Sequence, residues 1–212
     1  LKALMENKDV LLLMPTGGGK SLCFQLPAMM KEGTALVVSP LIALMKDQVE
    51  QLKRRGIPAL AVYSGMSFLE VKKTLQNAAY GNYKFLYVSP ERLETKLFLE
   101  YLPAMNINLL AVDEAHCVSQ WGYDFRPPYL RIANLRELLP DVPVLALTET
   151  KKKIVQDDIC EKLQPPNLKQ SSNQKKHSWQ IFQQSFERPN LSYSVFNAAS
   201  KQNNLLEILK NV

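Results

Sequence analysis

The sequence has 212 residues, enough for one sizeable α/β domain with its own core and a short extension, because domains usually hold roughly 100 to 200 residues. Hydrophobic residues make up 46% and charged residues 22%, as in globular proteins, and no apolar run approaches the roughly 20 residues that span a bilayer. The 26 Lys and Arg against 20 Asp and Glu give a formal charge of +6, which permits a polyanionic partner but is explained equally well as solubilising surface charge.

Short apolar runs bounded by turn residues alternate with longer amphipathic stretches, a pattern typical of βα units around a parallel sheet. We expect strands at 10–14, 35–39, 59–63, 85–89, 109–113 and 144–148. We expect helices at 20–31, 42–55, 69–79, 94–101, 128–139 and 151–163. Strands that are apolar throughout are buried on both faces, so the pattern predicts an α/β fold with a mostly parallel central sheet flanked by helices on both faces.

The composition changes near the end of the chain. Residues 164–178 read QPPNLKQSSNQKKHS, a polar stretch without periodicity that predicts an exposed loop. A further strand at 179–185 is expected to rejoin the sheet, which would close a first domain at 1–187. We expect 188–212 to hold a hinge and the beginning of a second domain, with a strand at 191–196 and a helix at 203–210.

A glycine-rich turn follows the first expected strand and precedes a helix. It reads Thr16-Gly17-Gly18-Gly19-Lys20-Ser21. Glycines let the backbone wrap closely around phosphate oxygens with its N–H groups inward, and the helix N-terminus adds a positive dipole. Lys20 would then contact the β and γ phosphates of a nucleotide, and the Ser21 hydroxyl would ligate Mg²⁺. A turn that only caps a helix would leave this Lys-Ser pair unexplained.

Carboxylates stand at the tip of the expected strand 109–113. Asp113 is placed to hold Mg²⁺, while Glu114 is placed to orient and deprotonate an attacking water. His116 lies too far along the chain to share the metal, and we expect it to sense the γ phosphate. A solvated strand end is the alternative, which the glycine-rich turn at Lys20 makes much less attractive.

The three cysteines are Cys23, Cys117 and Cys160, an odd number at wide spacing. They include no C-x-x-C pair and stand near no pair of histidines. This pattern predicts a reducing compartment and small, buried, apolar side chains rather than disulfides, and we expect no zinc site in the chain.

Several long motifs, in order, resemble the RecQ family of superfamily 2 helicases from about residue 4 to 212. They are MPTGGGKSLCFQLPA at 14–28, SPLIALMKDQV at 39–49, YVSPERL at 87–93 and DEAHCVSQWGYDFRPPY at 113–129. The resemblance implies a RecA-like P-loop NTPase lobe with a DEAH box, using ATP and Mg²⁺. It also implies 3′ to 5′ translocation on single-stranded DNA and unwinding at duplex junctions, in recombination, repair and replication. The chain would then be cytoplasmic and nucleoid-associated in a bacterium, or nuclear in a eukaryote.

Residues 119–129 form the family's aromatic-rich loop. Trp121, Tyr123 and Phe125 are expected to stack on bases, which tolerates any sequence, and Arg126 to pair with phosphate or with a carboxylate of the nucleotide site. Packing of the aromatic side chains as core is the alternative, which the Gly, Asp and Pro content of the loop disfavours.

Two serines follow strand ends. Ser39 and Ser89 are expected either to hold phosphates of the DNA backbone with their hydroxyls and neighbouring N–H groups, or simply to cap helices.

The chain departs from the family pattern at four places. Tyr123 replaces a histidine, Glu149 stands in a motif that usually reads T-A-T, the loop 164–178 is long, and motifs expected at both ends are missing. Met14 occupies the first glycine position of the strict phosphate-loop pattern, which favours a helicase-type loop over that of a small GTPase or nucleotide kinase. The sign of the Glu149 effect does not follow from the sequence. The glutamine motif that reads adenine would precede residue 1 and motifs IV to VI would follow residue 212, so we expect these 212 residues alone to hydrolyse ATP poorly and not to unwind DNA.

Two other functions fit parts of the sequence. A small-molecule phosphotransferase would share the phosphate loop but would carry a substrate lid in place of the aromatic loop. A non-catalytic nucleic-acid-binding module would not need Lys20, Asp113 and Glu114 together. Protein partners do not follow from the sequence, and no membrane association is expected.

Overall fold

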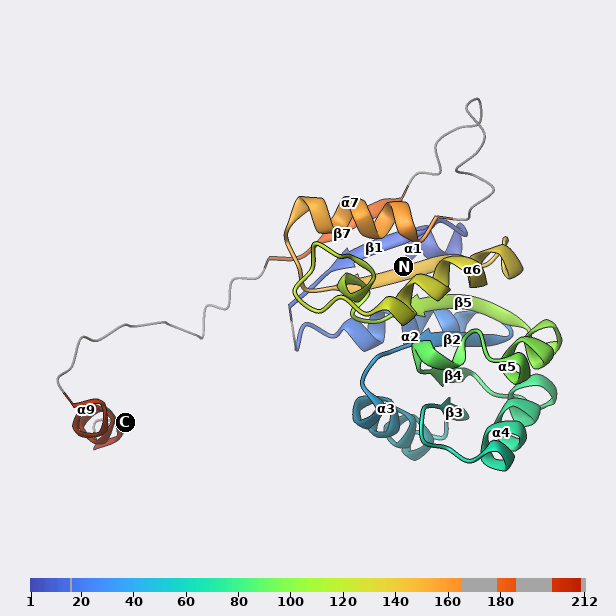
Figure 1. Cartoon of the computed structure of the whole chain (residues 1–212), viewed down its shortest axis with the longest axis horizontal. Helices are drawn as coiled ribbons and strands as arrows, with labels where there is room; N and C mark the ends of the chain where they lie inside the picture. Colours follow the sequence, from blue (N-terminus) through green and yellow to red (C-terminus); the bar gives the residue numbers. More distant parts are fainter. Residues whose placement is uncertain (16, 165–178, 186–199, 211–212) are drawn as a thin grey trace, which may run out of the picture.

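A computed structural model of the chain describes residues 1–15, 17–164, 179–185 and 200–210. Its centre is one seven-stranded sheet in the order β3-β4-β2-β5-β6-β1-β7, with every pair of neighbouring strands parallel (Figure 1). The strands are β1 (Val10–Leu13), β2 (Thr34–Val38), β3 (Ala59–Val62), β4 (Phe85–Val88), β5 (Ile107–Val112), β6 (Val144–Thr148) and β7 (Gln180–Gln183). The predicted α/β fold is confirmed, and the strand at 179–185 does rejoin the sheet, beside β1.

The two edge strands are less buried than the central strands. β7 is mostly exposed and the middle of β3 is only half-buried, whereas β2, β4 and β6 are buried along their whole length. The expectation of burial on both faces, made for the strand at 59–63, therefore fails at β3, whereas the strand at 179–185 was expected only to rejoin the sheet. Ile181 and Phe182 of β7 are exposed despite their apolar side chains.

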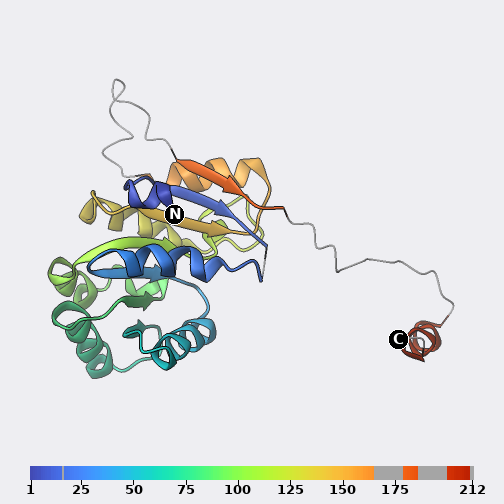
Figure 2. The same ribbon diagram turned by 180° about the vertical axis from the view of Figure 1, so that it is seen from behind.

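Helices cover both faces of the sheet, as predicted. They are α1 (Lys2–Met5), α2 (Lys20–Met30), α3 (Ile42–Arg54), α4 (Phe68–Tyr80), α5 (Lys96–Tyr101), α6 (Arg131–Leu138) and α7 (Lys153–Lys162). A further helix, α9 (Lys201–Lys210), follows residues that the structure does not describe. Figure 1 looks onto the face with α6 and α7, and Figure 2 onto the face covered by α2. No helix within the described ranges is both long enough and apolar enough to cross a membrane.

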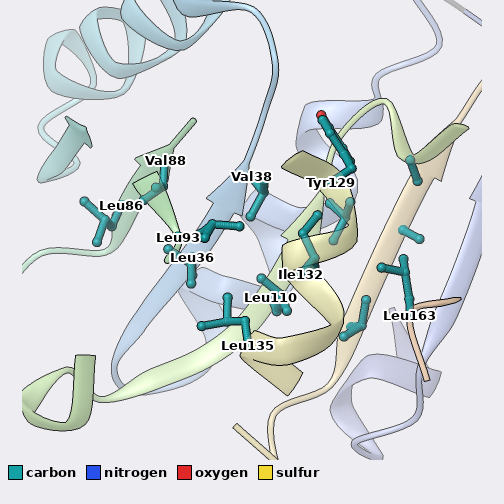
Figure 3. Packing of buried hydrophobic residues seen from close by; sticks show 14 of the residues in the cluster. Leu36, Val38, Leu86, Val88, Leu93, Leu110, Tyr129, Ile132, Leu135 and Leu163 are labelled. Atoms are coloured by element: carbon teal, nitrogen blue, oxygen red, sulfur yellow. The ribbon is translucent and has the colours of Figure 1, made fainter. Parts of the chain in front are cut away.

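The core has two halves, one on each face. Alternate residues of each central strand join opposite halves: Leu36 and Val38 face the larger cluster, while Ala35 and Val37 face the smaller one. Figure 3 shows the larger half, where Ile132 and Leu135 of α6 lie over the strands. This alternation follows from the period of two along a strand, and burial of each Leu or Ile stabilises the fold by about 1.5 to 3 kcal/mol.

Element boundaries differ from the predictions where proline intervenes. The helix expected at 128–139 starts as a 3₁₀ turn, Pro127–Leu130, before α6, because two successive prolines lack the N–H groups that an α-helix interior needs. The helix at 203–210 is observed as α9, Lys201–Lys210. The hinge, the strand at 191–196 and the polar loop beyond residue 164 lie outside the described residues, so the predicted domain boundaries stay predictions.

Candidate functional site

The glycine-rich turn lies between the carboxyl end of β1 and the first turn of α2. Gly17 and Gly19 have φ angles of +77° and +86°, a region that side chains with a Cβ adopt rarely. A Cβ on Gly18 would stand 3.0 Å from the carbonyl oxygen of Pro15. The backbone here requires glycine for its shape, as a cradle for phosphates does. Thr16, the first residue of the predicted site, lies outside the described residues.

Lys20 opens α2 and points at carboxylates that follow two other strands. Its Nζ lies 2.5 Å from Oε1 of Glu149 and 3.7 Å from Oε1 of Glu114. The strand order β5-β6-β1 explains why these side chains lie close together. Glu114 follows β5, Glu149 follows β6, and the turn that leads to Lys20 follows β1. The predicted proximity of the phosphate loop and the acidic strand end is therefore observed.

Asp113 ends β5 with its side chain buried. Burial, reinforced by the negative charge of Glu114 and partly offset by Lys20, raises the pKa of its carboxyl to about 6. The backbone carbonyl of Asp113 accepts a hydrogen bond of 2.9 Å from the Tyr129 hydroxyl. Tyr129 is fully buried, and its role as an anchor for this strand end was not predicted.

Glu114 adopts a left-handed backbone, with φ +48° and ψ +46°. This conformation costs a non-glycine residue of order 1 kcal/mol or more, and such strain concentrates at functional sites. Its backbone N–H donates to Oδ1 of Asp113 at 3.0 Å, which helps to orient the Asp113 carboxylate. The side chain is 22% exposed, so water can reach it.

His116 connects the acidic strand end with the end of β6. Its Nδ1 lies 3.4 Å from Oε2 of Glu114 and 3.3 Å from the hydroxyl of Thr148. Burial is the main cause that lowers its pKa, which favours the neutral imidazole at pH 7. A neutral ring between these groups can relay a change at one of them to the other.

A second connection leaves the phosphate loop toward α3 and β4. The side chain of Gln48 donates to the Ser21 hydroxyl at 3.2 Å and accepts from the Tyr87 hydroxyl at 2.8 Å. The hydroxyl of Ser21, the predicted magnesium ligand, is thereby held by a side chain of α3. Neither Gln48 nor Tyr87 was predicted, although both stand in the motifs at 39–49 and 87–93.

Of the three rings of the aromatic-rich loop that are expected to stack on bases, two face solvent. Trp121 is 62% and Tyr123 79% exposed, so packing as core is excluded for both rings. Phe125 is half-buried beneath the ammonium of Lys162, 5.9 Å from the ring centre. Arg126 donates two hydrogen bonds to Oδ2 of Asp124, at 2.8 and 3.1 Å, so its carboxylate partner is within the loop; its predicted pairing with phosphate stays a prediction.

Ser39 and Ser89 are placed at strand ends but are inaccessible, 2% and 1% exposed. Their N–H groups donate to the sheet, to the carbonyls of Val88 and Val62. The residue that caps α3 is Leu41, and Ser89 precedes a 3₁₀ turn without a side-chain cap. A DNA phosphate would therefore need a local rearrangement to reach either hydroxyl, and their predicted role stays a prediction.

Three potential metal ligands cluster beside the site. Single ligand atoms of His116, Cys117 and Asp124 all lie within 4.8 Å of one another. Burial raises the pKa of the Cys117 thiol to about 12, which disfavours the thiolate that zinc requires, and Asp124 is paired with Arg126. The protonated thiol and the Asp124–Arg126 pair explain why these three side chains can lie together with no need for a metal. The expected absence of zinc stays a prediction.

The sequence matches a known family over most of its length. A family model described as "DEAD/DEAH box helicase" matches residues 1–157. The chain is 42% identical over 195 residues to the ATP-dependent DNA helicase RecQ of Pasteurella multocida, covering 92% of this chain and 29% of that protein. It is 44% identical over 200 residues to RecQ of Bacillus subtilis, covering 94% and 32%. The chain thus spans about a third of the length of these relatives.

Solved structures share the fold at much lower identity. A hypothetical ATP-dependent RNA helicase from Sulfolobus tokodaii superposes with a TM-score of 0.60 at 16% identity, over 86% of this chain and 50% of that one. The Hef helicase domain of Pyrococcus furiosus gives 0.59 at 20% identity, over 84% and 35%. These likenesses concern the fold alone, which is that of a RecA-like helicase domain.

Proposed function

Because this chain belongs to the DEAD/DEAH box helicase family, we propose that it is the ATP-binding lobe of an ATP-dependent DNA helicase. One observation carries the proposal: the Lys20 ammonium faces the carboxylates that follow β5 across the carboxyl edge of the sheet, 3.7 Å from Glu114. Ligands of open α/β sheets bind at this edge, and the phosphate loop and the acidic strand end meet there.

The residues present fit Mg-ATP. Asp113 is buried next to the Glu114 carboxylate and its pKa is raised to about 6 even with Lys20 nearby, so a divalent cation bound here would stabilise the ionised carboxylate. Ser21 and Asp113 would hold Mg²⁺, which would neutralise charge on the phosphates. The amides of Gly17, Gly18 and Gly19 and the Lys20 ammonium would hold the phosphate oxygens.

Hydrolysis would be assisted by the carboxylate next to the metal ligand. The Glu114 side chain is 22% exposed and lies next to Asp113, which suits a residue that orients the attacking water and accepts its proton. His116, buried between Glu114 and Thr148, would relay the state of the γ phosphate to the end of β6.

Single-stranded DNA would be bound by the loop that follows the DEAH box. The exposed rings of Trp121 and Tyr123 offer stacking platforms, with Phe125 behind them and Arg126 available for phosphate after leaving Asp124. The names of the RecQ relatives support DNA as the substrate. We extend the proposal to 3′ to 5′ movement at duplex junctions during recombination, repair and replication, in the cytoplasm of a bacterium or the nucleus of a eukaryote.

Binding of a fluorescent ATP analogue to the chain, with and without Mg²⁺, tests the proposal. We expect saturable, Mg²⁺-dependent binding that Lys20→Ala weakens at least about tenfold, because an ammonium contact to phosphate is lost. A matched control is Lys96→Ala, which removes an exposed lysine from α5. Affinity that is the same in wild type and Lys20→Ala would contradict the proposal and would favour a non-catalytic nucleic-acid-binding module.

A further inference from the structure

We propose that Glu149 is an internal competitor of the nucleotide, whose carboxylate pairs with the Lys20 ammonium and must leave it when phosphates bind. The inference rests on the proposed function, because it concerns regulation of the same site. It starts from the shortest contact that Lys20 makes: Nζ lies 2.5 Å from Oε1 of Glu149.

The sheet brings these two residues together although 129 positions separate them. β6 lies between β5 and β1, and Thr148 at its end is paired in register with Leu13 of β1. The next residue, Glu149, thus leaves the sheet directly beside the turn that carries Lys20. The contact follows from strand order and register.

Burial makes this ion pair stronger than one on the surface. The side chain of Lys20 is 14% exposed and that of Glu149 is 32% exposed, so water screens their attraction only in part. For comparison, the partners in the pair Arg54 and Glu50 are 72% and 62% exposed. The charge of Lys20 is therefore already neutralised by a carboxylate of the protein itself.

Phosphates and the Glu149 carboxylate are alternatives at Lys20. The β and γ phosphates would bring negative charge to the same ammonium, and like charges a few ångströms apart repel in a partly buried site. Glu114 already lies 3.7 Å from the ammonium, so Glu149 would add a second carboxylate next to the phosphates. Nucleotide binding must break the Lys20–Glu149 pair.

A cavity next to Glu149 can accept its carboxylate once the contact with Lys20 is broken. A cavity of about 280 Å³ is lined by Glu149 together with Glu114, His116, Tyr123 and Arg126. The cationic group on the wall of this cavity is Arg126, which is paired with Asp124 of the same wall and belongs to the loop that carries the exposed aromatic rings. If Glu149 moves into this cavity when a nucleotide binds, it adds a negative charge next to the aromatic-rich loop.

Glu149→Gln tests the inference, because it removes the charge and keeps the shape. We expect Mg-ATP to bind about three- to tenfold more tightly than to wild type, the range that loss of one partly screened ion pair gives. The nucleotide-free variant should melt at a lower temperature, and its melting temperature should rise more on adding Mg-ATP. Glu100→Gln, which removes one exposed glutamate from α5, should match wild type in both measurements.

The outcomes separate this inference from the proposed function. Unchanged or weaker Mg-ATP binding in Glu149→Gln, while Lys20→Ala still weakens binding, would overturn the competitor role and leave the proposed function standing. No loss of binding in Lys20→Ala would overturn both. Glu149→Ala is the second variant: it should also tighten binding, and weaker binding in it would count against the inference even if Glu149→Gln folded poorly.

Discussion

The ring of Tyr123 lies nearly parallel to the imidazole of His116, with ring centres 4.7 Å apart and planes inclined by 24°. Tyr123 is 79% exposed, whereas His116 is 3% exposed. One aromatic side chain of the solvent-facing loop therefore covers the histidine that contacts Glu114 and Thr148. Through this stack, a base that displaced the Tyr123 ring would change the surroundings of His116.

Tyr123→Ala should raise the pKa of His116. Burial is the main cause that lowers this pKa, and removal of the covering ring lets water reach the imidazole. An NMR titration of the histidine ring protons measures it directly; the chain has two histidines, and His177→Ala assigns the signals. Trp121→Ala, in the same loop, is the control that should leave the pKa unchanged. If the pKa of His116 is the same in Tyr123→Ala as in wild type, the Tyr123 ring does not shield the imidazole from water.

Much of this architecture is predictable from the sequence because it is local. Each central strand is a short apolar run between turn residues, and each expected helix has a regular apolar side, as Val49 and Leu52 show in α3. The glycine turn before Lys20 and the acidic pair Asp113 and Glu114 are recognisable because phosphate and magnesium require those residue types in that order.

The contacts between strand ends are not predictable in this way. Strand order and register decide that Glu149 meets Lys20, and a single sequence does not specify either. The same holds for Tyr129, whose hydroxyl reaches the carbonyl of Asp113 through the fold of an irregular loop. Gln48 appears in sequence as one polar residue of an amphipathic helix, and only the packing of α3 places it against Ser21.

Asp9→Ala should destabilise the domain strongly. Asp9 and Arg136 form an ion pair of 2.5 Å with both side chains 2% exposed, and Asp9 also accepts from the N–H of Val144 at the start of β6. Loss of Asp9 leaves the buried Arg136 charge without its partner, which lowers the free energy of unfolding by about 3 to 5 kcal/mol. Urea denaturation measures the free energy of unfolding. Glu50→Ala, which breaks the exposed pair with Arg54, should cost less than about 1 kcal/mol, and similar losses in both variants would refute the prediction.

The thiols of the native chain should react slowly with Ellman's reagent at pH 8. Burial raises the pKa of Cys117 to about 12 and of Cys160 to about 11, and it also raises that of Cys23. The thiolate is the reactive form, so a raised pKa leaves a fraction of roughly 10⁻³ or less for the first two at this pH. All three should react at least about tenfold faster in guanidinium. Cys117 should be the last to react, and its rapid labelling in the native chain would show that it is accessible.

Asp113→Asn should make the magnesium-free protein more stable at pH 7.5 while it weakens Mg-ATP binding. The folded-state pKa of about 6 lies above the ordinary value of 3.8, so the ionised carboxylate is held at a cost in the folded chain. A raised pKa contributes stability that is fully present below about pH 4 and is lost as the pH rises through 6. The Asn side chain cannot ionise, so the free energy of unfolding of the variant should be higher than that of wild type by roughly 1 to 3 kcal/mol at pH 7.5. This advantage should shrink between pH 6 and pH 4, as wild type takes up its proton on folding.

Urea denaturation at pH 7.5 and at pH 4, in EDTA, checks the stability half of this prediction, and titration with the fluorescent nucleotide in Mg²⁺ checks the other. The ionised Asp113 carboxylate destabilises the fold but is needed to bind magnesium. The same variant should therefore gain folding stability and lose affinity for Mg-ATP. Asp141→Asn, an exposed carboxylate between α6 and β6, is the control, and it should change neither. An Asp113→Asn variant that is less stable than wild type at pH 7.5, or that binds Mg-ATP equally well, would show that Asp113 serves the fold rather than the metal.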